Sequence, residues 1–160
     1  MHRESEPLFD APVVVEDAFV APLYDRRQIV QRPEAPEIRL LTRDLWVVGP
    51  SEAVSEALYD HFRDSGIFPQ VLRSSRNVPD PYLIQARVHE LEYRCCAGTP
   101  RALFEIELLL LDVQGRVLAR TSSVSQDEIS ESVTEFVLAV NARLTEAIDT
   151  FVSEVRAAAP

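Results

Sequence analysis

The sequence has no lysine, only four glycines and two cysteines, and no apolar run long enough to cross a bilayer. A membrane-spanning helix needs about 20 mostly apolar residues, whereas the run over residues 103–111 is interrupted by Glu105 and Glu107. So few glycines leave no loop of the kind that cradles phosphates. The motifs of serine hydrolases and zinc proteases are also missing. The sequence therefore predicts no enzyme, no catalytic residue and no cofactor.

Positive charge is scarce as well, and the 16 basic residues are all arginine against 26 acidic residues. The resulting formal charge of -10 repels phosphate backbones and anionic lipid headgroups. We therefore expect no nucleic-acid partner. Residues 1–6 are mostly charged or polar and lack the apolar segment of a signal peptide.

The two cysteines, Cys95 and Cys96, are neighbours in the chain. A bridge between adjacent cysteines strains the peptide that joins them, so we expect two unpaired thiols in a hairpin loop. Together with His89 they could in principle bind a metal ion. A tetrahedral site needs a fourth ligand and usually a wider cysteine spacing, so the sequence predicts no metal site.

Residues 102–111 alternate along one face, where Phe104, Ile106 and Leu108 recur at the two-residue period of a strand. Asp112-Val113-Gln114-Gly115 follows with the residue types of a tight turn, and residues 117–124 alternate again. The sequence predicts a β-hairpin. Leu109 and Leu111 make the distal end of the opposite face apolar too, so a helix or a second subunit should cover them.

At 160 residues the chain has the length of one domain. Residues 1–11 are expected to form a flexible arm, and residues 12–157 a single α+β domain. Strands are predicted at 13–15, 28–32, 37–43, 82–93, 102–111 and 117–124, with a bulge near His89-Glu90, and residues 67–73 lead into a further strand. Helices are predicted from Ser51, as N-cap, to Gly66, and over residues 132–156. The fold class is therefore α+β: a mixed or antiparallel sheet that includes a C-terminal three-strand meander, with two helices packed on one face.

One segment, "PLYDRRQIVQR" at residues 22–32, followed by an Arg-Leu strand, Trp46 and "SGIF" at residues 65–68, resembles the ABC-type transport auxiliary lipoprotein family. The later stretches "YLIQARVHELEY", "FEIELLLLDVQGRVLART" and "FVLAVNARLTEAIDTFVSEV" are also similar to that family. The resemblance covers residues 12–156. The segment "VVGP" at residues 47–50 departs from the family's pattern after the tryptophan.

The resemblance implies a non-enzymatic accessory subunit of a paraquat-inducible or MCE-type transport system for lipids or other apolar compounds. Such proteins are periplasmic and attached to the outer membrane by an N-terminal lipid anchor. This chain shows no lipidated cysteine or signal, so we expect both to have preceded residue 1 in the full-length lipoprotein. The implied partners are the transporter's periplasmic components, with a homo-oligomer also possible.

Two modes of action remain open at this point. The subunit could act by protein–protein contact, or it could carry an apolar ligand between sheet and helices, which needs a cavity of about 300 Å³ or more. The bulky residues of the helix stripes favour the packed domain. The predicted partner interface is Tyr24, Arg26, Arg27, Leu109 and Leu111, because loop arginines and aromatics are typical contact residues. Structural roles are predicted for the family-motif residues Gln28, Ile29, Arg32, Trp46 and Gly66, with Arg32 and Trp46 fixing the sheet edge through ion pairs and stacking.

Overall fold

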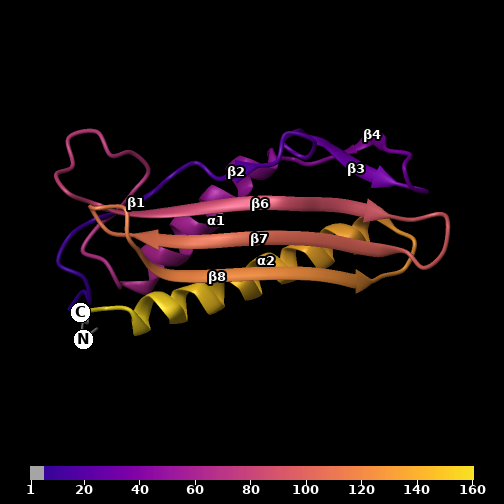
Figure 1. Ribbon diagram of the computed structural model, residues 1–160. Helices are drawn as coiled ribbons and strands as arrows, with labels where there is room; N and C mark the ends of the chain where they lie inside the picture. Colours follow the sequence, from indigo (N-terminus) through magenta and orange to yellow (C-terminus); the bar gives the residue numbers. More distant parts are fainter. Residues whose placement is uncertain (1–5) are drawn as a thin grey trace.

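The computed structural model describes residues 6–160, which fold as one sheet with two long helices behind it (Figure 1). The strands, in chain order, are β1 Val13–Val15, β2 Phe19–Val20, β3 Gln28–Arg32, β4 Arg39–Leu45, β5 Val71–Leu72, β6 Tyr82–Arg94, β7 Arg101–Leu111 and β8 Val117–Glu128. The helices are α1 Pro50–Ser65 and α2 Val133–Ala157. The predicted α+β class with a mixed sheet is confirmed.

Strand β6 is the centre of the sheet, because four other strands, β1, β2, β3 and β7, pair with it. On one side it pairs antiparallel with β7, which pairs antiparallel with β8. On the other side the three short strands β1, β2 and β3 follow one another along β6, all parallel to it. Strand β4 extends β3 in the antiparallel sense, and β5 extends β1. Four strands of the described sheet therefore pair on one side only: β2, β4, β5 and β8.

The predicted meander is confirmed, including its turn and its bulge. At the turn, Asp112 Oδ1 accepts hydrogen bonds from the backbone N–H groups of Gln114 and Arg116, both at 2.9 Å. Gly115 follows with a φ of 79°, a left-handed conformation that glycine adopts without steric cost. The register of β6 shifts between Val88 and Glu90, where the bulge was expected. Strand β8 continues to Glu128, four residues past the predicted end at 124, because residues 125–128 keep their pairing with β7.

Both helices bury an apolar stripe, and the largest fully buried side chains include Phe62, Phe136 and Phe151. Helix α2 packs on the meander, and α1 packs on α2 and on the short strands β1, β2 and β5. The expected N-cap at Ser51 is wrong: Gly49 is the N-cap and Pro50 opens α1, since proline suits a first helical position that needs no N–H. Ser51 Oγ instead donates to the Ala18 carbonyl at 2.6 Å. Gly66 ends α1 in the left-handed conformation, as predicted.

The described part of the expected N-terminal arm begins at residue 6, and residues 1–5 lie outside the described residues. Phe9 is buried, stacked on Phe68 at 4.5 Å between ring centroids and set edge-on to Tyr82 at 5.0 Å. The backbone N–H of Leu8 donates to the Ile67 carbonyl at 2.8 Å. Residues 8 and 9 therefore do not belong to a loose arm. The Phe9 side chain buries enough apolar area to hold this segment on the domain.

In the described residues, neither helix is both long and apolar enough to cross a bilayer.

Candidate functional site

The loop over residues 21–27 joins β2 to β3 and holds three of the predicted contact residues, Tyr24, Arg26 and Arg27. Tyr24 lies within it and is buried, and its hydroxyl donates a 2.9 Å hydrogen bond to Glu92 Oε2 on β6. Burial, together with this neighbouring carboxylate, raises the pKa of Tyr24 above its ordinary value. Tyr24 was expected to reach out toward a partner. The structure places it inside the domain, where it ties the loop to the central strand.

The carboxylate of Glu92 is the centre of a buried ion-pair cluster. Arg32 Nε donates to Glu92 Oε1 at 3.0 Å and Arg32 Nη2 donates to Oε2 at 3.2 Å. Arg94 Nε also donates to Oε1 at 3.0 Å. Burial by itself would raise the pKa of Glu92, but the hydrogen bonds from Arg32, Tyr24 and Arg94 lower it, so the carboxylate stays ionised. The cluster explains why this sequence segment needs a tyrosine and, eight residues later, an arginine.

Trp46 follows β4, and both its backbone N–H and its backbone carbonyl form hydrogen bonds with Arg27. The backbone N–H of Trp46 donates to the Arg27 carbonyl at 2.8 Å, and Arg27 Nε donates to the Trp46 carbonyl at 3.0 Å. The indole ring packs on Phe136 of α2, with 5.8 Å between centroids. Arg32 thus forms an ion pair with Glu92, whereas the Trp46 ring lies tilted by 50° against the Phe136 ring instead of stacking on it.

The other two motif residues differ in their surroundings. Ile29 is buried in the core, and Gln28 is half-buried at the start of β3. Gln31, which also lies on β3, makes a polar contact: its Nε2 lies 2.9 Å from the Cys95 sulfur.

Arg26 and Arg27 are the cations of this loop that reach its surface. Arg27 is exposed. Arg26 is half-buried, and its Nε is enclosed with no hydrogen-bond partner among the described residues. A buried donor without a partner costs free energy, and because this atom is enclosed, an acceptor from another molecule reaches it only if the Arg26 side chain moves.

Leu109 and Leu111 lie on the face of the meander that faces away from the helices. Leu109 pairs across the sheet with Gln85 on β6 and with Arg120 on β8, and its side chain is only 8% exposed. Leu111, at the end of β7, is half-buried. The predicted cover for Leu109 is therefore largely supplied by its own sheet neighbours, since long polar side chains shield apolar surface with their stems.

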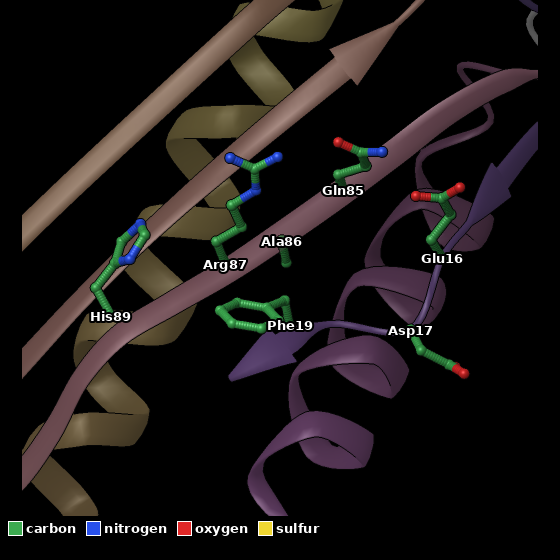
Figure 2. A pocket seen from close by; sticks show the side chains of 7 residues that line it. All are labelled: Glu16, Asp17, Phe19, Gln85, Ala86, Arg87 and His89. Carbon is green, nitrogen blue, oxygen red and sulfur yellow. The ribbon is translucent and has the colours of Figure 1, made fainter. Parts of the chain in front are cut away.

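Beside these residues an open groove of about 460 Å³ runs between β2 and β6. Figure 2 shows Phe19 in the middle of it, Arg87 and His89 at one end and Glu16 and Asp17 at the other. Phe19 is 56% exposed, and it is not among the site residues predicted from the sequence. The sequence offers only a weak indication of it: an aromatic residue shortly after two acids, in a segment too short to be predicted as a strand.

The two neighbouring cysteines form a disulfide, contrary to the expectation of free thiols. Cys96 adopts a φ of 79°, a backbone change that lets adjacent side chains meet, and the sequence gives no sign of it. The expected companion His89 lies in the Phe19 groove. In the described chain, the ligand atoms that gather near the two sulfurs come from Glu131 instead.

The space between the sheet and the helices is nearly filled. The apolar pocket there is partly open to the surface, measures about 70 Å³ and is lined by residues such as Trp46, Val54, Phe104 and Leu144. The larger hollows, of about 330 to 500 Å³, are open surface grooves.

Comparison with known proteins gives the following likenesses. Protein XCC0632 from Xanthomonas campestris has 22% sequence identity, covers 95% of this chain and 87% of its own, and superposes with a TM-score of 0.75. The PelC dodecamer from Paraburkholderia phytofirmans has 16% identity, coverage of 95% and 94%, and a TM-score of 0.52. Lipoprotein GNA1162 from Neisseria meningitidis has 10% identity, coverage of 88% and 99%, and a TM-score of 0.50. At these identities the likeness is one of fold. No curated protein sequence matches the chain.

The family comparison is more specific. Residues 3–151 match the family described as the ABC-type transport auxiliary lipoprotein component, which is a family of transport auxiliary lipoproteins and not of enzymes. That range includes the Tyr24–Arg32–Glu92 cluster and the whole sheet. The chain belongs to the ABC-type transport auxiliary lipoprotein component family.

Proposed function

We propose that this auxiliary component is a non-enzymatic periplasmic subunit that acts by protein–protein contact. The observation that supports it best is the filled space between sheet and helices, where the apolar pocket measures only about 70 Å³. A domain with a solid core offers its partners a surface rather than an internal binding site. An accessory subunit of a transporter needs such a surface and needs no cofactor.

The same observation weighs against the alternative function, a carrier that holds an apolar ligand between sheet and helices. Sites for drug-sized ligands occupy about 300 to 1,000 Å³, several times the volume of the apolar pocket between sheet and helices. Opening a larger site would mean separating Trp46 from Phe136, which now pack together. Contact is therefore the favoured mode of action.

The proposed system is a paraquat-inducible or MCE-type transporter for lipids or other apolar compounds, and the proposed partners are its periplasmic components. An N-terminal lipid would anchor the full-length protein to the outer membrane. The acidic surface, with a formal charge of -10, disfavours direct binding to anionic headgroups and fits attachment through the lipid.

The proposed contact surface contains the guanidinium groups of Arg26 and Arg27. Both are loop cations on an acidic protein, and Arg26 has an enclosed Nε without a partner among the described residues. Leu111 remains a further candidate because it is half-buried at the end of β7. Tyr24 and Leu109 are buried and would support this surface indirectly, Tyr24 by fixing the loop and Leu109 by packing in the sheet.

The test is capture of the transporter's periplasmic protein by the tagged full-length lipoprotein in detergent. We expect co-purification of that protein with wild-type bait and weaker co-purification with the Arg26→Ala/Arg27→Ala bait. Mass spectrometry of lipids extracted from the purified subunit separates the two modes of action. Stoichiometric lipid beyond the covalent anchor, without a captured protein, would support the carrier instead.

A further inference from the structure

The loop over residues 95–100 joins β6 to β7 and begins with the disulfide between Cys95 and Cys96. Figure 1 shows this loop at the end of the sheet opposite the C-terminus. The two cysteines differ in access, because Cys95 is buried and Cys96 is exposed. A thiol from solution therefore reaches the bridge at Cys96. Which sulfur is attacked is one of the factors that set the rate of thiol–disulfide exchange.

The buried sulfur of Cys95 has the hydrogen-bond donor that a leaving thiolate needs. Gln31, on the neighbouring strand β3, places its side-chain Nε2 2.9 Å from this sulfur. Burial alone disfavours a thiolate, but a donor stabilises the charged form of a group over its neutral form. A stabilised thiolate also leaves faster. Attack at Cys96 with departure of Cys95 is therefore the favoured direction of exchange.

Opening this bridge leaves the rest of the fold unchanged. The bridge joins neighbouring residues, so it closes no long loop and restricts the unfolded chain far less than a bridge across many residues does. The sheet and both helices are held by their own pairing and core. The protein can therefore carry the open form of the bridge while it stays folded.

The charges beside the bridge are mainly acidic. Glu131 is exposed, and a carboxylate oxygen of it lies within 4.8 Å of both sulfurs. Glu34 lines the groove of about 500 Å³ that Cys95 also lines. Neither glutamate forms an ion pair among the described residues, and the whole chain has a formal charge of -10. Such surroundings attract a cationic thiol and repel an anionic one.

Arginines line the same groove, but their charges are already matched within the chain. Each of them is ion-paired with Glu92 or with Glu128. The groove therefore offers little free positive charge to an anionic thiol. The arginines concerned are Arg32, Arg94 and Arg101.

We propose that the Cys95–Cys96 bridge is a thiol–disulfide exchange site for a thiol that carries positive charge near its sulfur. The incoming thiolate attacks Cys96 Sγ and forms a new S–S bond there. The Cys95–Cys96 bond breaks, and its electron pair leaves on Cys95 Sγ, beside the Gln31 amide. One disulfide is lost and one is gained, so the step consumes no further oxidant or reductant. The exchange needs no transporter component and goes beyond the proposed contact function.

The test compares two small thiols of equal length and opposite charge, cysteamine and mercaptoethanesulfonate, on the purified oxidised protein. Rates are expressed per concentration of thiolate. We expect cysteamine to react about threefold faster or more at low salt, and the difference to shrink at high salt. Acid quenching, alkylation and tandem mass spectrometry should locate the added thiol on Cys96 and the alkyl group on Cys95.

A peptide with one cysteine between two arginines distinguishes the two sources of such a thiol. A rate per thiolate above that of cysteamine would point to a cysteine of a partner protein. A lower rate would point to a small aminothiol. Either result is compatible with the site, since both thiols are cationic.

Two variants with matched controls test the roles of the neighbouring side chains. Gln31→Leu should slow the exchange about threefold to tenfold, because Cys95 leaves without its donor. Gln28→Leu, at a half-buried glutamine of the same strand, should react like wild type. Glu131→Gln should reduce the preference for cysteamine, whereas Glu135→Gln, at an exposed site in the first turn of α2, should keep it. Thermal unfolding should show that all variants are folded.

The measurements on wild type need no variant and are decisive by themselves. Addition of the thiol to Cys95, or equal rates for cysteamine and mercaptoethanesulfonate, would overturn the proposal. So would two free thiols in the purified protein, or a folded Gln31→Leu variant that reacts as fast as wild type.

Discussion

Arg32 and Glu92 lie 60 residues apart in the chain, yet the guanidinium of Arg32 donates hydrogen bonds to both oxygens of the Glu92 carboxylate, at 3.0 and 3.2 Å. The pair joins β3 to β6 at the point where the sheet turns from its long meander to the β3–β4 extension. The Glu92 side chain is 1% exposed and the Arg32 side chain 21% exposed. Arg94 and Tyr24 also donate to this carboxylate, so both of its oxygens accept hydrogen bonds inside the domain.

Replacing one partner of this pair should destabilise the fold. We expect Glu92→Gln to lower the free energy of unfolding by about 2 to 4 kcal/mol, because it leaves the partly buried Arg32 without its counter-charge. Urea denaturation measures the change. Glu105→Gln is the control, since it makes the same change at a half-buried glutamate of β7 outside the cluster. Equal stability of Glu92→Gln and the control would show that the cluster adds nothing to the fold.

The same cluster should make stability depend on pH in the acidic range. The folded-state pKa of Glu92 is lower than its unfolded value, so its ionised form stabilises the fold above the unfolded pKa. That contribution is lost as the pH falls through the unfolded value, about 4.3, toward the lower folded value. We therefore expect the stability difference between wild type and Glu92→Gln to shrink below about pH 4.5, as measured by thermal unfolding from pH 7 to pH 3. A constant difference over that range would contradict the assignment.

A buried charge in the meander should be more damaging. Leu108 has no exposed area and pairs with Ala86 and Thr121 in the adjacent strands. Leu108→Asp should cost several kcal/mol, about 4 or more, because a carboxylate would be desolvated without a partner. Val124→Asp, on the exposed face of β8 where Val124 is 67% exposed, should stay within about 1 kcal/mol of wild type. Similar melting temperatures for the two variants would contradict the core assignment.

Most of the sheet could be predicted from the sequence because the meander satisfies local rules. Its alternation, its Asp-to-Gly turn and the phase shift at His89-Glu90 are each visible within about a dozen residues, and all three are confirmed. Strand β5 lies within the strand expected at residues 67–73, whereas the two-residue strand β2 was not predictable, because its pairing with β6 depends on residues distant in the chain.

The candidate site was harder to predict, because exposure depends on long-range contacts. Tyr24 is in a loop, but a carboxylate 68 residues away draws its hydroxyl inward. Leu109 has an apolar side chain on the outer face, yet Gln85 and Arg120 shield it. The ion pair of Arg32 could be predicted, because an arginine at a sheet edge commonly meets an acidic side chain. Trp46 does contact an aromatic ring, but it is tilted against Phe136 and does not stack.

The neighbouring cysteines should contain no free thiol. Cys95 and Cys96 are joined in the structure, so purified, unreduced and denatured protein should fail to react with a thiol reagent until a reductant is added. The bridge closes no long loop, so reduction should change stability by much less than the about 3 kcal/mol expected for a 15-residue loop. Cys95→Ser/Cys96→Ser is the control for reagent specificity. Two reactive thiols before reduction would show that the cysteines are unpaired in solution.

The last prediction concerns the two surface arginines of the loop before β3. Arg26→Ala/Arg27→Ala should leave the fold intact, within about 1 kcal/mol of wild type. The contact of Arg27 with the Trp46 carbonyl is exposed, and Arg26 Nε has no partner to lose within the described residues. Association with the transporter's periplasmic component should weaken, because arginine side chains that pair with a partner at the centre of an interface commonly contribute 2 kcal/mol or more to binding, in order of magnitude about a 30-fold change in Kd. Arg63→Ala/Arg76→Ala, which removes the same charge from other exposed sites, should bind like wild type. An unfolded Arg26→Ala/Arg27→Ala variant would make these arginines structural, and a folded variant with unchanged affinity would place the interface elsewhere on the domain.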